Sequence, residues 1–224
     1  MKLRTTVIGA AVVLLSACKT YISTDPYSSD LIAATEGETL TAPLVIGTQT
    51  SSDCTSDASK LLTSLQIQMP DAEFMGCTKV NYDDIAQFRI QAAIVDMRDN
   101  SSAALQAPFG IGVIRQSGEI KVLFLSNELR IRQLWDNLPE DVRGYNRFSF
   151  EPVLSTTLTN DLRTDIKVLI DDVFADGTPY PDESQHVMPR RDQIEIRLSD
   201  VSNAAFNTTQ SALTILRLKT PDDS

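Results

Sequence analysis

The first eighteen residues constrain this chain most, because they decide in which compartment the rest of it folds. Lys2 and Arg4 give the start two positive charges, and an apolar stretch follows from Val7 to Leu15. That stretch is too short for a bilayer-spanning helix, which needs about 20 apolar residues. A cationic start followed by a short apolar stretch is typical of a secretory signal peptide. The sequence therefore predicts export from the cytoplasm, with residues 1–17 absent from the folded protein.

The apolar stretch ends in Leu15-Ser16-Ala17-Cys18. These residues resemble the lipobox of bacterial lipoproteins, in which a Leu and two small residues precede an invariant Cys. The resemblance implies that a peptidase cuts after Ala17 and that Cys18 carries a diacylglyceryl group and a further acyl chain such as palmitate. Each buried methylene contributes roughly 0.8 kcal/mol, so two or three chains anchor the protein firmly. The alternative is an ordinary secretory peptide with a chance cysteine.

Residue 19 is Lys and not Asp. By the same resemblance, an Asp at this position retains lipoproteins in the inner membrane of enterobacteria. The resemblance therefore implies a protein on the outer membrane that faces the periplasm.

Cys54 and Cys77 remain once Cys18 is assigned to lipid. Exported proteins meet oxidising conditions, in which two cysteines commonly pair, so we expect a Cys54–Cys77 disulfide. Closing a loop of about 24 residues stabilises the fold by about 3.5 kcal/mol in the chain-entropy model. The alternative, a nucleophilic or redox-active thiol, requires a nearby base, and the chain has a single histidine, His186.

The acidic composition narrows the possible partners. Cleavage after Ala17 removes Lys2 and Arg4 and no acidic residue, so the formal charge falls from −10 to −12. Phosphate binding needs clustered Lys and Arg, which argues against nucleic acid as a partner. The same charge argues against peripheral binding to anionic lipid headgroups.

Composition divides the mature chain into four regions, and its length allows one large domain or two small ones. Residues 18–37 are rich in Ser, Thr, Asp and Gly and are expected to form a polar tether, the alternative being that they pack onto the fold. Residues 38–143 are expected to form an α+β domain. Residues 144–220 are expected to form a β-rich region or second domain, followed by a polar tail over 221–224.

A β-α-β-β unit is predicted at the start of the α+β domain. Alternating side chains predict strands over 39–49 and 85–97, a second short strand is expected over 72–79, and leucines at helical spacing predict a helix over 60–69. If the first two strands are parallel and joined by the helix, their carboxyl ends lie on the same side of the sheet. That arrangement brings Cys54 and Cys77 within the distance that a disulfide requires.

A hairpin and a helix follow this unit. The segments 109–115 and 120–125 are predicted to pair, and Asn127 is predicted to cap a helix with an apolar stripe of Ile131, Leu134, Trp135 and Leu138. After residue 144 the predicted elements are strands alone, over 148–158, 165–175, 193–198 and 208–219. Strands without intervening helices predict a mainly antiparallel region, and the fold class is therefore α+β.

The sequence predicts no catalytic residues and no cofactor. A Ser or Cys nucleophile requires a positioned base, and zinc requires several His or Cys ligands. Asp171, Asp172 and Asp176 are weak candidates for a metal, because calcium prefers clustered carboxylate oxygens. Their spacing does not match an EF-hand loop, so we expect solvated carboxylates and no metal site.

Our leading hypothesis is a non-enzymatic, lipid-anchored envelope protein with a binding or assembly role toward another protein. With its lipobox, its Lys19-Thr20 start and its paired cysteines, the chain resembles small lipoproteins of uncharacterised families encoded by phages and mobile elements. The alternatives are a small-ligand or calcium-binding lipoprotein that uses the region from Asp171 to Glu183, and an envelope hydrolase. A protein-binding module predicts an exposed apolar patch or an unpaired strand edge, whereas a hydrolase predicts a pocket with paired carboxylates or a Ser-based dyad.

Overall fold

The computed structural model describes residues 20–50, 53–80, 82–98, 106–138, 140, 152–209 and 212–219. The predicted signal peptide, Cys18 and the predicted polar tail lie outside the described residues. Within these ranges, every helix is too short or too polar to cross a membrane.

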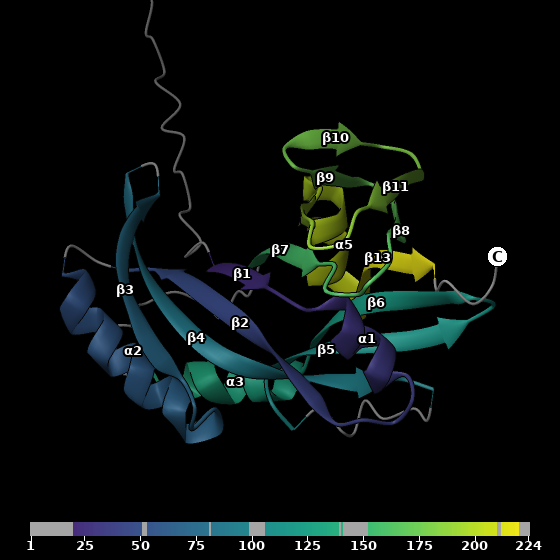
Figure 1. Ribbon diagram of the computed structural model, residues 1–224. Coiled ribbons are helices and arrows are strands. Elements are labelled where there is room, and N and C mark those ends of the chain that lie inside the picture. Colours follow the sequence, from purple (N-terminus) through teal and green to yellow (C-terminus); the bar gives the residue numbers. More distant parts are fainter. Residues whose placement is uncertain are drawn as a thin grey trace, which may run out of the picture.

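One sheet of 13 strands organises the fold (Figure 1). Neighbouring strands follow the order β10-β9-β12-β7-β1-β2-β4-β5-β6-β13-β8-β11, and β3 pairs with β4. Most pairs are antiparallel, while β1–β7 and β4–β5 are parallel. The strands are β1 (Thr20–Thr24), β2 (Leu40–Gln49), β3 (Glu73–Val80), β4 (Asp83–Asp96), β5 (Phe109–Gln116), β6 (Glu119–Ser126), β7 (Pro152–Thr159), β8 (Ile166–Ile170), β9 (Val173–Ala175), β10 (Thr178–Tyr180), β11 (Ser184–Met188), β12 (Gln193–Leu198) and β13 (Ala212–Lys219). The helices are α1 (Ser28–Ala34), α2 (Cys54–Gln68), α3 (Glu128–Asp136) and α5 (Asp200–Thr209). The protein is thus a mixed fold of helices and strands that is dominated by its sheet.

The predicted polar tether over 18–37 is wrong from Thr20 onward, because this segment forms β1 and α1. β1 lies between β7 and β2 within the sheet, and α1 buries Leu31 completely. The segment is polar in composition because its hydroxyl groups bond to the backbone of distant strands. Thr24 Oγ1 donates to the Pro43 carbonyl and Ser28 Oγ to the Thr159 carbonyl, each over 3.1 Å.

β2 and β3 run in the same direction and are joined by α2, but they are not neighbours in the sheet. β4 lies between them and pairs antiparallel with both. Thr48 of β2 and Cys77 of β3 both lie opposite Ala86, one on each side of β4. The alternation predicted for 85–97 is confirmed, since Phe88, Ile90, Ala92 and Ile94 are all buried. β4 can therefore occupy the centre of this region because both of its edges and one whole face are covered.

The region after residue 144 adds to the same sheet and does not form a separate domain. β7 extends the sheet from β1, and β13 extends it from β6. The strand predicted over 165–175 is two strands, β8 and β9, which are separated by Asp171 and by Asp172 with a φ of 51°. β8 pairs with β13 while β9 pairs with β12, at the other end of the strand order. The bent β8–β9 segment therefore joins the two ends of the sheet, which curls round on itself.

Helix α5 packs between the two limbs of this curled sheet, and the sequence analysis missed it. The last strand, predicted over 208–219, begins only at Ala212. α5 contacts β7 and β12 on one side, while the Phe206 ring meets Phe124 of β6 edge-on with centroids 5.5 Å apart. Ser199 supplies the local signal for this helix, because its Oγ accepts from the Ser202 N–H over 3.1 Å.

The hairpin and the capped helix predicted after residue 108 are confirmed. β5 and β6 pair antiparallel around Ser117 and Gly118, whose φ values of 51° and 78° form a two-residue hairpin turn. Asn127 Oδ1 accepts from the Arg130 N–H over 3.2 Å at the start of α3. Of the predicted apolar stripe, Ile131 is buried, whereas Trp135 is only half-buried.

Candidate functional site

β3 has an outer edge that the rest of the described chain leaves unpaired over its whole length. β3 and β5 bond to the same edge of β4, β3 along residues 83–89 and β5 along residues 93–96. Between these two stretches, the Asp71 carboxylate accepts from the Gln91 N–H over 2.6 Å. β3 and β5 are therefore two separate strands along one edge of β4. The outer backbone groups of β3 face away from β4.

The side chains of β3 are exposed to an extent that is unusual for this fold. None of its eight residues is buried, and the large side chains of Phe74 and Met75 are 37% and 45% exposed. The register with β4 shifts between Phe74 and Gly76, which makes Met75 the extra residue of a β-bulge. Gly76 adopts a φ of +141°, which a side chain would disfavour. Two large apolar side chains thus stand next to each other beside a free strand edge.

The predicted Cys54–Cys77 disulfide is confirmed, and it fastens this strand to a helix. The two Cα atoms are 6.3 Å apart, and the bond joins the first residue of α2 to the middle of β3. Asp53 caps the same helix, since its Oδ1 accepts from the Ser56 N–H over 3.0 Å. Cys54 is nearly buried while Cys77 is exposed. The disulfide therefore holds β3 in place where burial contributes little.

Among the described strands, β10 and β11, which lie at the two ends of the strand order, also have free outer edges, and these edges are better protected. β10 has three residues including Pro179, which lacks an N–H to donate. β11 has five residues and follows directly after Asp182 and Glu183. Short strands, proline and flanking charges are the features by which natural proteins block strand addition at an edge. Val187, 58% exposed, is the large apolar side chain at the free edge of β11.

The weak metal candidates do not converge on one point. Asp171 and Asp172 line a depression of about 380 Å³ together with Lys121, Ser202 and Arg217. Asp176 lies at the far end of β9, where its Oδ1 accepts from the Glu195 N–H over 3.0 Å. The described residues contain no group of three or more His, Cys, Asp or Glu side chains that could hold a metal ion.

Asp172 and Arg217, two of the charged residues of this depression, are engaged with other side chains of the fold. Ser202 Oγ donates to the Asp172 carboxylate over 2.6 Å. Arg217 bonds to Glu183 and, over 3.1 Å, to Glu119. The hydrogen bond to Glu183 is the main reason that the pKa of Arg217 is raised above its usual value. The depression is therefore a junction of β8, β13 and α5 whose polar groups stabilise the fold.

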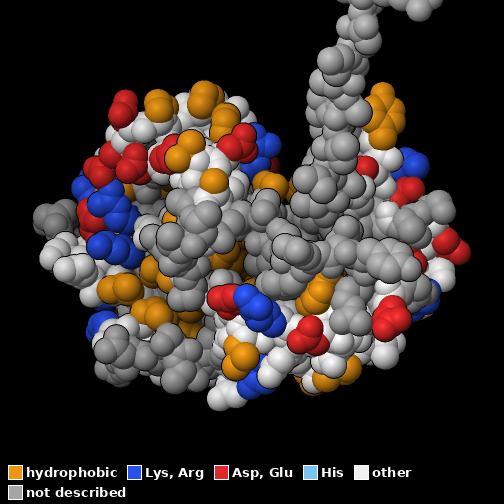
Figure 2. Space-filling view, turned by 180° about the vertical axis from the view of Figure 1, so that it is seen from behind, with side chains coloured by type: hydrophobic (Ala, Val, Ile, Leu, Met, Phe, Trp, Pro, Cys, Tyr) orange, Lys and Arg blue, Asp and Glu red, His pale blue; other side chains and the backbone are white. Residues whose placement is uncertain are grey.

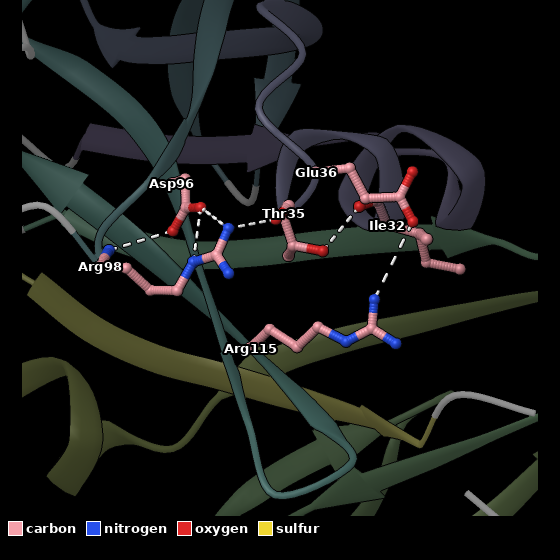
Figure 3. Close-up of polar contacts among 6 residues, drawn as sticks. All are labelled: Ile32, Thr35, Glu36, Asp96, Arg98 and Arg115. Atoms are coloured by element: carbon pink, nitrogen blue, oxygen red, sulfur yellow. Dashed lines mark hydrogen bonds and ion pairs between the residues drawn. The ribbon is translucent and has the colours of Figure 1, made fainter. Parts of the chain in front are cut away.

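A second polar cluster fastens α1 to the ends of β4 and β5 (Figure 3). Arg98 bonds through its guanidinium to the Asp96 carboxylate and to the Thr35 carbonyl at the C-terminus of α1, where a cation is favourable. The hydrogen bond from Arg98 lowers the pKa of Asp96 below its usual value. Arg115 approaches Glu36 to 3.9 Å. These contacts hold α1 in place although the helix is short.

His186, the one candidate base, lies on β11. It is half-buried, and its ring meets Tyr180 of β10 edge-on with centroids 4.7 Å apart. Its ring therefore packs β11 against β10.

On the face opposite to that of Figure 1, charged side chains of both signs are interspersed with small groups of hydrophobic side chains (Figure 2). The described part of this face carries mixed charge. Because its backbone is unpaired and its large apolar side chains are exposed, the β3 edge, the outer side of Glu73–Val80, is our candidate functional site.

The sequence analysis missed Phe74, Met75 and Tyr82 as candidate site residues. Tyr82, in the turn that joins β3 to β4, is 97% exposed. A local signal for the first two was present, because adjacent apolar residues before Gly76 break the alternation of a regular strand. That the edge beside them is free is a property of strand order, which no local pattern reports.

Comparison with known proteins places the chain in a family but not beside a characterised relative. A family model described as "Domain of unknown function (DUF7424)" matches residues 20–220. No curated protein and no solved structure matches the chain.

Proposed function

The chain belongs to the DUF7424 family. From its sequence and the geometry above we propose a lipid-anchored, non-enzymatic envelope protein that binds another protein at the β3 edge. The partner supplies an extended segment that adds to β3 as a further strand. Cys18 carries the lipid, and the protein faces the periplasm from the outer membrane. The observation that carries the proposal is the unpaired edge of β3 beside the exposed Phe74 and Met75.

The lipid anchor is supported by the order of charge, apolar stretch, small residues and cysteine before Lys19. The match to the family begins at residue 20, two residues after Cys18, which agrees with a boundary there. The Cys54–Cys77 disulfide agrees with folding in an oxidising compartment.

Strand addition is supported by what β3 offers to an incoming segment. Its outer backbone groups can form main-chain hydrogen bonds, which give such complexes their affinity, and its side chains give specificity. β3 has eight residues and is longer than β10 and β11, the strands at the other free edges. Phe74 is itself supported from below by Phe88, with ring centroids 5.7 Å apart, so it presents a firm surface.

Replacing Cys18 by serine is expected to abolish lipidation of the protein. Serine cannot accept the diacylglyceryl group, so both lipidation and cleavage after Ala17 are blocked. We expect the wild-type protein in the membrane fraction with acyl mass on its N-terminus, and the Cys18→Ser variant without that mass. The measurement is fractionation of the native host followed by mass spectrometry.

The matched control is Ser16→Ala, which keeps a small residue before Cys18 and should leave the acyl mass unchanged. An intact Met1 or a mature terminus without acyl mass in the wild-type protein would contradict the anchor.

The β3 edge is expected to crosslink to a partner in intact cells. A photoreactive side chain at position 75 should form an adduct with another envelope protein, while the same probe at position 187 should give none above background. Once the adduct identifies the partner, Met75→Lys should weaken the affinity by about 2 kcal/mol, roughly 30-fold in Kd, because an apolar contact is replaced by a buried charge.

Val187→Lys is the matched control, because it adds the same charge at the free edge of β11. This variant should leave the Kd unchanged. Equal adducts at both positions, or adducts only with a second copy of this chain, would refute binding of another protein at the β3 edge. The crosslinked peptide should come from a segment of the partner that is extended and alternately apolar.

A further inference from the structure

We propose that the β3–β4 hairpin touches the bilayer, with Tyr82 at its tip seated among the lipid headgroups. This inference rests on the lipid anchor at Cys18 proposed above. Its first basis is how little chain separates that anchor from the fold. Cys18 precedes Thr20, the first residue of β1, by two residues. Two residues span at most about 7 Å, so the end of the sheet where β1 begins must lie against the membrane.

The register of the sheet shows that the hairpin points the same way. Thr20 lies opposite Thr48, Thr48 opposite Ala86, and Ala86 opposite Cys77, so these four residues share one level across four strands. β1 and β4 are both antiparallel to β2 and therefore run in the same direction. Going backward from Thr20 toward Cys18 thus leads the same way as going backward from Ala86 toward Tyr82.

The hairpin reaches beyond the point at which the chain enters the sheet. Tyr82 precedes Ala86 by four residues, which is about 13 Å of strand at about 3.3 Å per residue. That exceeds the roughly 7 Å available between Thr20 and Cys18. Figure 1 shows the turn between β3 and β4 standing out from the body of the sheet, above the start of β1. With the lipid of Cys18 in the membrane, the tip of the hairpin reaches the headgroup layer.

The tip is built for an interface that is polar but not strongly charged. Tyr82 is 97% exposed, so its ring contributes nothing to the core, and Tyr is enriched where membranes meet water. The two carboxylates beside it are paired: Asp83 accepts from Gln49 Nε2 over 2.9 Å, and Asp84 lies 3.2 Å from Lys79 Nζ. The contact therefore depends on the aromatic ring and not on attraction to anionic lipid, in keeping with the acidic net charge of the chain.

The test places a fluorescent indole at the tip. The full lipidated Tyr82→Trp protein is reconstituted in vesicles of phosphatidylethanolamine and phosphatidylcholine, with or without bromine on the acyl chains. We expect bromine to quench most of the emission that the substitution adds. The wild-type protein, whose single Trp is Trp135, supplies the background. Ile67→Trp is the matched control, because Ile67 is also well exposed but lies near the end of α2 that points away from Thr20.

Sedimentation of the same vesicles separates the two proposals. Protein that fails to sediment with the vesicles would refute the lipid anchor. Protein that sediments but shows no more quenching for Tyr82→Trp than for Ile67→Trp would refute the hairpin contact alone. Quenching confined to Tyr82→Trp in sedimented protein supports both.

Discussion

Replacing Phe206 by alanine is expected to lower the free energy of unfolding by about 3–5 kcal/mol, the range for a buried Phe truncated in a well-packed core. Phe206 is 4% exposed and contacts Phe124, which in turn stacks near Phe109 at 6.2 Å. Because α5 sits between two limbs of one sheet, the cavity opens where those limbs meet and neither can close over it. Equilibrium unfolding in urea, followed by circular dichroism, measures the loss.

Val201→Ala in the same helix is the control. Val201 is 73% exposed, so this substitution should change the free energy of unfolding by less than about 0.5 kcal/mol. Equal small effects for both variants would contradict the placement of α5 between the limbs of the sheet. A total stability of about 5–15 kcal/mol, usual for a domain, makes the effect of Phe206→Ala easy to resolve.

Removing the disulfide with the double variant Cys54→Ser, Cys77→Ser is expected to cost about 3.5 kcal/mol, from the entropy that the closed loop removes from the unfolded chain. For a chain of this size that corresponds to a fall in Tm of roughly 7–14 °C. The loss should be uneven, because β3 has no buried residue and pairs with one strand only. Amide hydrogen exchange should therefore accelerate more in β3 than in β2, which has a strand on each side.

Reduction of the wild-type protein provides the control for this prediction. A reductant should lower the Tm of the wild-type protein, whose Cys77 is exposed, to that of the double variant, and should leave the double variant unchanged. A double variant that unfolds at the wild-type temperature, with exchange in β3 unchanged, would show that burial alone holds this strand.

The sequence predicted only part of the proposed partner site. The strand itself and its disulfide were predicted, the disulfide from the cysteine count. The edge was not, because Asp71 interrupts the pairing on β4 and β5 joins the same side of β4 only beyond it. These contacts involve residues 17 or more positions apart in the chain, and neither leaves a pattern in any short window.

The acidic residues between Asp171 and Glu183 are close in sequence but do not converge on one point in the fold. Clustered carboxylates favoured a calcium site only weakly, and the fold parts Asp176 from Asp172, since Asp172 bonds to Ser202 of α5 and Asp176 to the Glu195 N–H of β12. Proximity in sequence did not become proximity in space because the extended strand β9 lies between these two residues.

By itself the sequence determined the elements whose causes are local. The alternation of β4, the turn at Ser117-Gly118 and the Asn127 cap each depend on residues within a few positions of one another. Only the tertiary structure decided which strands are neighbours. It put β1 inside the sheet beside β7, set β4 between β2 and β3, and joined the two ends of the sheet through β8 and β9. The physical reason is that strand order follows from burying apolar faces contributed by distant segments, and the backbone of a strand bonds equally well to any neighbour that those faces bring alongside it.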